Sequence, residues 1–180
     1  MDIQLRKLEL NDIEMVRNWR NSDEVSKYMY TSPKITPEQQ LEWFKKIENR
    51  TDCVYWIIEY DGKSVGLANL TGIDYNLYSC YWAFYIGDTS IRGAGIGSKV
   101  EYNVLGFVFE FMELHKLRCE VLITNPNVIK MHRGFGFNIE AYYTDHCYKE
   151  GKWVDVVGMA MLRQDWYDNK QRLYDKIYKR

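Results

Sequence analysis

The chain has 180 residues, of which 46% are hydrophobic and 27% are charged, and its net charge at pH 7 is -1. This size predicts a single domain over residues 1–180 with a sizeable core, and the near-neutral charge disfavours a nucleic-acid binder. The longest apolar runs are too short to cross a bilayer, so no membrane contact is expected. A charged N-terminus unlike a signal peptide, and four scattered cysteines without a CxxC pair, indicate a cytoplasmic protein with free thiols.

The first half of the chain predicts two helices between a first strand and a β-hairpin. Alternating apolar and charged residues over 3–8 predict a strand, and the Asn-Asp pair soon after it can cap a helix. A capping threonine, a proline and a glutamine at 36–39 predict a second helix start. The β-branched and aromatic run 53–60, an Asp-Gly turn and the run 65–72 predict the hairpin.

The second half alternates strands and helices. Mixed strands with interleaved helices imply an α/β fold whose sheet is only partly parallel. The remaining strands are predicted over residues 79–87, 117–124, 134–143 and 154–162, and helices over residues 97–112, between the strands ending at 124 and starting at 134, and as an exposed C-terminal tail over 164–180.

Three glycines, Gly93, Gly95 and Gly97, lie directly in front of one predicted helix. A helix start presents four free backbone N–H groups and a partial positive charge, and glycine lets a ligand approach them closely. The pattern therefore indicates an anion site, most naturally for phosphate, with Arg92 adding a fixed charge. A tight turn without a ligand is the structural alternative. The run matches neither the P-loop nor the dinucleotide fingerprint, which leaves the pattern Arg-x-x-Gly-x-Gly.

This remaining pattern, formed by Arg92, Gly95 and Gly97, resembles the acyl-CoA pyrophosphate motif of the GNAT family of N-acetyltransferases. The resemblance covers about residues 2–162 and implies the GNAT fold, a mixed and mostly antiparallel sheet with splayed central strands and flanking helices. A second motif of the family is matched farther along the chain by Asn125, Ile129, His132, Gly136 and Phe137.

The resemblance implies acetyl-CoA as cosubstrate, no metal, and direct attack of an acceptor amine on the thioester while a nearby group protonates the departing thiolate. Pantetheine would pair with the backbone of the splayed strand at Trp82, Ala83, Phe84, Tyr85 and Ile86. The rest of the implied cofactor site is Arg92, Gly93, Ala94, Gly95, Ile96, Gly97 and Ser98 for the pyrophosphate, together with Asn125 and Ile129.

The proton donor is a point where this chain departs from the family, which more often has tyrosine at the position of His132. A free imidazole has a pKa of about 6.5 and is scarcely protonated at pH 8. Two alternatives stay open: His132 passes the amine's proton to the sulfur, or Tyr142 or Tyr143 donates the proton. A metal set of His132 with His115 and His146 is disfavoured, because their spacings match no ligand pattern.

The N-terminal half is similar to a GNAT subgroup that acetylates the 4-amino group of a UDP-linked 4-amino-4,6-dideoxy sugar in pseudaminic acid synthesis. The resemblance implies that Arg20 contacts the nucleotide phosphates and that Met29 and Tyr30 line the sugar pocket, with Asn21 also at the acceptor. The matching pairs are Arg20-Asn21, Met29-Tyr30 and Trp43-Phe44.

Other interpretations of these residues remain. Trp43 and Phe44 have the spacing of core residues on a helix, and Arg20 can form an exposed pair with Asp23 or Glu24. The acceptor can instead be a protein N-terminus or a polyamine, although a polyamine site should be strongly acidic. A CoA-binding module without activity is the non-enzymatic alternative. The general base is unassigned between Glu120, Asp155 and ordered water, and the assembly is open, with a homodimer as one alternative.

Overall fold

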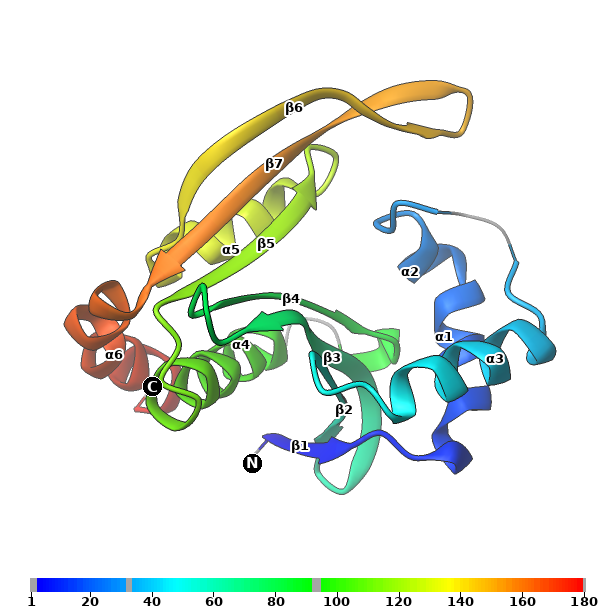
Figure 1. Ribbon diagram of the computed structural model, residues 1–180, viewed down its shortest axis with the longest axis horizontal. Helices are drawn as coiled ribbons and strands as arrows, with labels where there is room; N and C mark the ends of the chain where they lie inside the picture. Colours follow the sequence, from blue (N-terminus) through cyan, green and yellow to red (C-terminus); the bar gives the residue numbers. More distant parts are fainter. Residues whose placement is uncertain (1–2, 32–33, 92–94, 180) are drawn as a thin grey trace.

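The computed structural model describes residues 3–31, 34–91 and 95–179 of the chain. Seven strands form one sheet in the order β1-β2-β3-β4-β5-β7-β6 (Figure 1). The strands are β1 (Ile3–Lys7), β2 (Cys53–Tyr60), β3 (Lys63–Asp74), β4 (Ser79–Ile86), β5 (Lys116–Leu122), β6 (Asn138–Lys149) and β7 (Lys152–Leu162). The helices are α1 (Ile13–Asn21), α2 (Asp23–Ser26), α3 (Pro37–Glu48), α4 (Ile96–Gly106), α5 (Pro126–Phe135) and α6 (Arg163–Tyr178).

The sheet is mostly antiparallel, as expected, because only the pairing of β4 with β5 is parallel among the described strands. Both of its faces are covered by helices. On β2, Ile57 and Ile58 point to opposite faces and both are completely buried. Ile57 packs with α1 and α3, whereas Ile58 belongs to the main core with α4 and α6.

Local sequence signals explain where several elements begin and end. The hydroxyl of Thr36 accepts a hydrogen bond from the amide of Gln39, and the Gln39 side chain accepts one from the Thr36 amide, so the predicted capping box starts α3. Gly136 ends α5 with φ of 118°, a conformation that favours glycine. The predicted turn between the last two strands joins β6 to β7.

Some predicted boundaries were wrong. The strand predicted over residues 134–143 begins at Asn138, because α5 continues through Phe135. The helix predicted over residues 97–112 is α-helical only to Gly106 and continues as one turn of π-helix over Phe107–Phe111. The single turn α2 was not predicted, because four residues show no apolar periodicity. The C-terminal helix is not wholly exposed, since Trp166 and Leu173 are buried.

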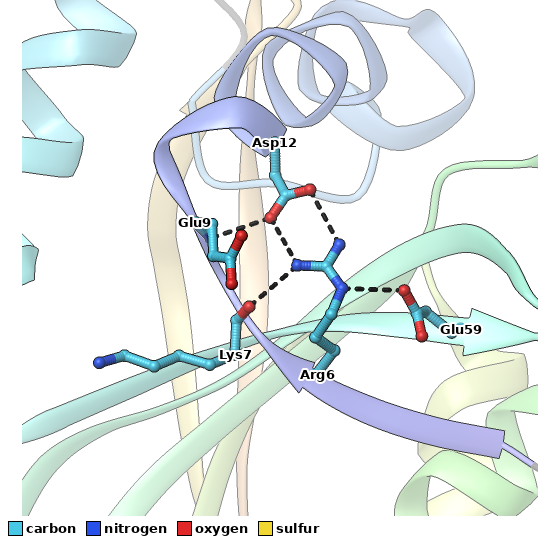
Figure 2. A network of polar contacts seen from close by, with 5 residues as sticks. All are labelled: Arg6, Lys7, Glu9, Asp12 and Glu59. Carbon is cyan, nitrogen blue, oxygen red and sulfur yellow. Dashed lines mark hydrogen bonds and ion pairs between the residues drawn. The ribbon is translucent and has the colours of Figure 1, made fainter.

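A charged network fixes β1 to the start of α1 (Figure 2). The guanidinium of Arg6 donates to both carboxylate oxygens of Asp12 at 2.9 Å and to Glu59 on β2 at 2.8 Å. Asp12 also accepts a hydrogen bond from the Glu9 amide. Arg6 holds the pKa of the Asp12 carboxyl below its usual value, despite partial burial. The network sets the position from which α1 extends toward the cavity described next.

Candidate active site

The main cavity lies where β4 and β5 separate. The two strands pair in parallel only at Ser79, Cys80 and Tyr81 of β4 among the described residues. Beyond this point β4 continues to Ile86 while paired with β3, and β5 continues along β7. Figure 1 shows β5, β6 and β7 diverging from β4, with α1 and α2 at the open end. Both separated strands line a cavity of about 870 Å³, which confirms the splayed central strands.

The predicted cofactor strand forms one wall of this cavity. All five residues from Trp82 to Ile86 line it. The backbone of this segment pairs with β3 on one side, and its other edge borders the gap left by β5. An unpaired strand edge presents N–H and C=O groups that an extended, amide-containing ligand can bind.

Only part of the predicted glycine loop can be described. Arg92, Gly93 and Ala94 lie outside the described residues. Gly95 precedes α4 with φ of 73°, and a side chain added there would meet no atom of the described structure within 4 Å. Gly95 has no side chain to cap the helix, so within the described part of the chain no side chain accepts from the first amides of α4. A bound anion would satisfy them.

The other predicted cofactor residues lie in three places: the cavity wall, the core and a surface hollow. The Ile96 side chain is buried in the core, so only its backbone could reach a ligand, and Ser98 is half-buried. A methyl group added at Gly97 would lie 3.5 Å from Phe84, a residue of the cavity wall. Asn125 at the start of α5 lines the cavity. Ile129 instead lines a shallow surface hollow with Pro126, Lys130 and two neighbours.

His132, in the last turn of α5, lines the cavity although it is only 3% exposed. Its Nδ1 lies 2.8 Å from Oε1 of Glu101, a carboxylate of α4 that is completely buried. The edge of the ring faces Trp82, with ring centroids 5.2 Å apart. Burial alone would lower the pKa of His132, but Glu101 and the nearby Cys119 thiol outweigh burial and raise it to about 10.

Tyr142 and Tyr143, the alternative proton donors, lie on β6. Both are exposed, and neither is among the described residues that line the cavity. The Tyr142 hydroxyl donates to the carboxylate of Asp155 on β7, which raises the pKa of the tyrosine. The structure therefore brings His132 to the splayed strands and places the two tyrosines elsewhere.

Arg20, at the end of α1, lines the cavity on the side of the N-terminal helices. Its guanidinium has a single long hydrogen bond, 3.5 Å to the Thr31 hydroxyl, and the described residues place no carboxylate within ion-pair distance. The pairing with Asp23 or Glu24 considered above is absent from these residues. Burial lowers the pKa of Arg20, so this is a cation partly withdrawn from water and without a countercharge among the residues that the structure describes.

Two further predicted acceptor residues line the same region. Met29 and Tyr30 are both part of the cavity wall. The hydroxyl of Tyr30 donates to Glu120 on β5 at 2.5 Å, and this contact joins the N-terminal helices to the splayed strand. Burial and the Glu120 carboxylate raise the pKa of Tyr30.

Asn21 lies beside Arg20, but its side chain is hydrogen-bonded to the protein backbone. Its side-chain amide donates to the carbonyl of Ile35 at 2.9 Å and accepts from the Ile35 amide at 2.8 Å. Asn21 is not among the described cavity residues, whereas Ile35 is. The side chain therefore holds the segment that leads into α3.

The Trp-Phe pair of α3 contributes one residue to the cavity and one to the core. Trp43 lines the cavity and packs edge-on against Tyr55, whereas Phe44 is buried in the core. The other cavity residues are aromatic, aliphatic and amide side chains, and its acidic and basic members among the described residues are Arg20, Glu24, Glu120 and His132.

Two carboxylates in this region were missed or left unassigned from the sequence. The signal for Glu101 was a lone acidic residue inside a largely apolar helix, a pattern that predicts a paired buried charge. Glu120 lies on a strand whose alternation did not fix its direction, and in the structure it lines the cavity.

The arrangement of the side chains and helices also bears on metal binding and on membrane spans. Within residues 3–31, 34–91 and 95–179, no group of three or more His, Cys, Asp or Glu side chains is placed to hold a metal ion. The helices of the same residues include none long and apolar enough to cross a membrane.

Comparisons with known proteins agree with this geometry. The chain is 22% identical over 170 residues to spermidine N(1)-acetyltransferase of Vibrio cholerae, which covers 94% of this chain and 98% of the relative. It is 23% identical over 133 residues to the acetyltransferase PseH of Campylobacter jejuni, covering 74% and 81% of the two chains. A crystal structure of the Vibrio cholerae spermidine N-acetyltransferase with CoA and spermine superposes with a TM-score of 0.87 at 22% identity, covering 92% and 98%.

The family assignment follows from the match over most of the chain. The separated strands, the helix start at Gly95 and the cavity between them fit acetyl-CoA as cosubstrate of an N-acetyltransferase. Residues 2–138 match the family described as "Acetyltransferase (GNAT) domain", so the chain belongs to the GNAT acetyltransferases.

Proposed function

We propose that the acceptor is the 4-amino group of a UDP-linked 4-amino-4,6-dideoxy sugar. The observation that carries this proposal is Arg20, a partly buried cation in the cavity wall without a carboxylate partner among the described residues. Such a cation is stabilised when a ligand brings a negative charge, and the fork of a guanidinium suits a diphosphate. The motifs around Arg20, Met29 and Tyr30 resemble the subgroup with this acceptor.

A second group beside Arg20 supports an acceptor with polar oxygen atoms. The hydroxyl of Tyr85 is buried and has no hydrogen-bond partner among the described residues. Burial raises the pKa of Tyr85, and the charge of Arg20 opposes that rise, so the two groups are electrostatic neighbours. A buried hydroxyl without a partner is costly, and an oxygen atom of the bound acceptor would relieve this cost.

A polyamine is the second candidate. A relative of this chain is a spermidine N(1)-acetyltransferase, and a solved structure with a similar fold is a spermidine N-acetyltransferase in complex with CoA and spermine. Glu24 and Glu120 are the acidic residues that line the cavity and would serve such an acceptor. Arg20 argues against it, because a positive charge in the wall repels a polycation.

The chemistry is the same for either amine. The unprotonated nitrogen attacks the thioester carbonyl carbon, the C–S bond of the tetrahedral intermediate breaks, and the sulfur takes the electron pair and a proton. We assign the donation of that proton to His132, because it lines the cavity beside the splayed strand. Tyr142 and Tyr143 are outside that cavity.

An acceptor screen with acetyl-CoA tests the proposal. The release of CoA is followed with a thiol reagent for the UDP-linked amino sugar, the same sugar without its nucleotide, spermidine, and a peptide with a free N-terminus. The UDP-linked sugar should turn over fastest, and the sugar without its nucleotide should require a much higher concentration. Preferred turnover of spermidine would establish the polyamine acceptor instead.

A further inference from the structure

Glu101 and His132 form a buried pair between α4 and α5. The carboxylate is completely buried, the imidazole is 3% exposed, and 2.8 Å separates Oε1 of Glu101 from Nδ1 of His132. The second carboxylate oxygen of Glu101 has no hydrogen-bond partner among the described residues. His132 is therefore the group on which the buried carboxylate depends for compensation of its charge.

The two nitrogens of the His132 ring face different groups. Nδ1 is committed to Glu101, and the ring lines the cavity beside Trp82. The other nitrogen, Nε2, makes no contact with Glu101, and the Cys119 thiol that interacts with the ring lines the same cavity. A carboxylate at Nδ1 fixes the orientation of an imidazole and stabilises its protonated form.

The protonation of the pair follows from the groups around it. Burial raises the pKa of Glu101 against the opposing charge of His132. The pKa of His132 is also raised, by Glu101 on α4 and by the Cys119 thiol on β5, against the effect of burial. Both shifts have the same consequence: the pair keeps one proton through neutral pH and titrates as a unit. We assign that proton to His132, because a positively charged imidazolium and a negatively charged carboxylate attract each other across the hydrogen bond.

We propose that Glu101 is a positioning residue that keeps His132 as an imidazolium whose Nε2–H is available to the leaving sulfur. The inference rests on the proposed role of His132 as proton donor, and it does not depend on the acceptor. It removes the difficulty that a free imidazole would scarcely be protonated at pH 8.

The proton balance of the step is complete. As the C–S bond breaks, its electron pair moves to sulfur, and the Nε2 proton moves to the same atom to give CoA thiol. The ring is then neutral and still hydrogen-bonded through Nδ1 to Glu101. The nitrogen of the new amide loses its extra proton to solvent, and an equal proton from solvent restores the imidazolium before the next turnover.

Glu101→Gln tests the role through the pH dependence of the rate. The amide keeps the shape of the side chain and removes its charge. If the pKa of His132 falls to its free value of about 6.5 or below it, at most about 3% of the ring is protonated at pH 8. The ratio of wild-type to variant kcat should therefore be about thirtyfold or more at pH 8 and should decrease steadily as the pH is lowered to 6. This ratio cancels the titration of the acceptor amine.

A purely structural role would give a different profile. It would lower kcat by the same factor at every pH, and this result would overturn the inference. Glu48→Gln makes the same chemical change on the exposed surface of α3 and should give a ratio near one throughout. Circular dichroism confirms that the variants are folded.

A second measurement leaves Glu101 and His132 unchanged and needs no turnover. The chain has three histidines, so the imidazole NMR signals of the wild-type protein can be followed from pH 5 to pH 10 and assigned by comparison with His115→Gln and His146→Gln. His132 should stay protonated above pH 9. Titration of His132 near or below pH 6.5 would refute the role of Glu101. A protonated His132 with an unchanged rate in His132→Phe would instead refute only its role as proton donor.

Discussion

Arg20→Ala tests whether the cavity accepts an anionic group on the side of the N-terminal helices. In the structure the guanidinium lines the cavity and has one long hydrogen bond to Thr31. Its removal should therefore act on acceptor binding and leave the fold nearly unchanged. Substitutions that break no ion pair usually alter the free energy of unfolding by less than about 0.5 kcal/mol, so Tm should shift by about 2 °C at most.

The expected effect on the acceptor follows from the strength of a charge-assisted hydrogen bond. Such a bond contributes about 1.5–3 kcal/mol, and about 1.4 kcal/mol corresponds to a tenfold change in affinity. The KM for the UDP-linked amino sugar should rise about tenfold to a hundredfold, with the KM for acetyl-CoA nearly constant. Arg20→Lys should recover only part of the loss, because a lysine cannot form the bidentate contact.

Steady-state CoA release at varied acceptor and saturating acetyl-CoA provides the assay. Arg50→Ala is the matched control, because Arg50 forms an exposed pair with Asp52 and is not among the described cavity residues. Its kinetic constants should equal those of the wild type. Equal acceptor KM values for Arg20→Ala and Arg50→Ala would refute the phosphate contact. A higher turnover of spermidine by Arg20→Ala would fit the removal of a repulsive charge.

Three further changes test other parts of the account. Gly95→Val should weaken acetyl-CoA binding in calorimetric titration by more than tenfold, whereas Gly62→Val, with a similar φ of 72° and equally open surroundings, should cost comparable stability and leave the affinity intact. His132→Phe should lower kcat by about a hundredfold and lower Tm, since it leaves Glu101 buried without its partner; adding Glu101→Gln should restore Tm without restoring kcat. Asp12→Ala should lower the free energy of unfolding by about 1–2 kcal/mol at pH 7. Because the folded pKa of Asp12 lies below its unfolded value, this difference should be full above about pH 5 and shrink in denaturant titrations as the pH falls below about 4.

Local sequence signals predicted the elements well where a turn or cap defines them. The capping box at Thr36 and the run of β2 both lie where expected. The sequence did not predict α2, because a single turn has no apolar periodicity. It placed the start of β6 too early, because that start depends on where α5 ends. Periodicity also cannot reveal the change from α-helix to π-helix after Gly106.

The site was predicted as far as contiguous motifs extend. The family resemblance implied the splayed strand, and the glycine run predicted a helix start at residue 97, next to the observed first residue Ile96. The pair of Glu101 with His132 joins residues 31 positions apart, and the contact of Tyr30 with Glu120 joins residues 90 positions apart. Contacts of this kind depend on how the helices and strands assemble, so one sequence read along its length does not reveal them.

The central claim is that this GNAT acetyltransferase acts on a nucleotide-linked amino sugar. The most direct test is the ratio of kcat/KM for the UDP-linked 4-amino-4,6-dideoxy sugar to that for spermidine, measured with one enzyme preparation at pH 8 and with the acetylated products verified by mass spectrometry. The account predicts a ratio of about a hundred or more, as a phosphate contact and the repulsion of a polycation both favour the sugar. A ratio of one or below would contradict it.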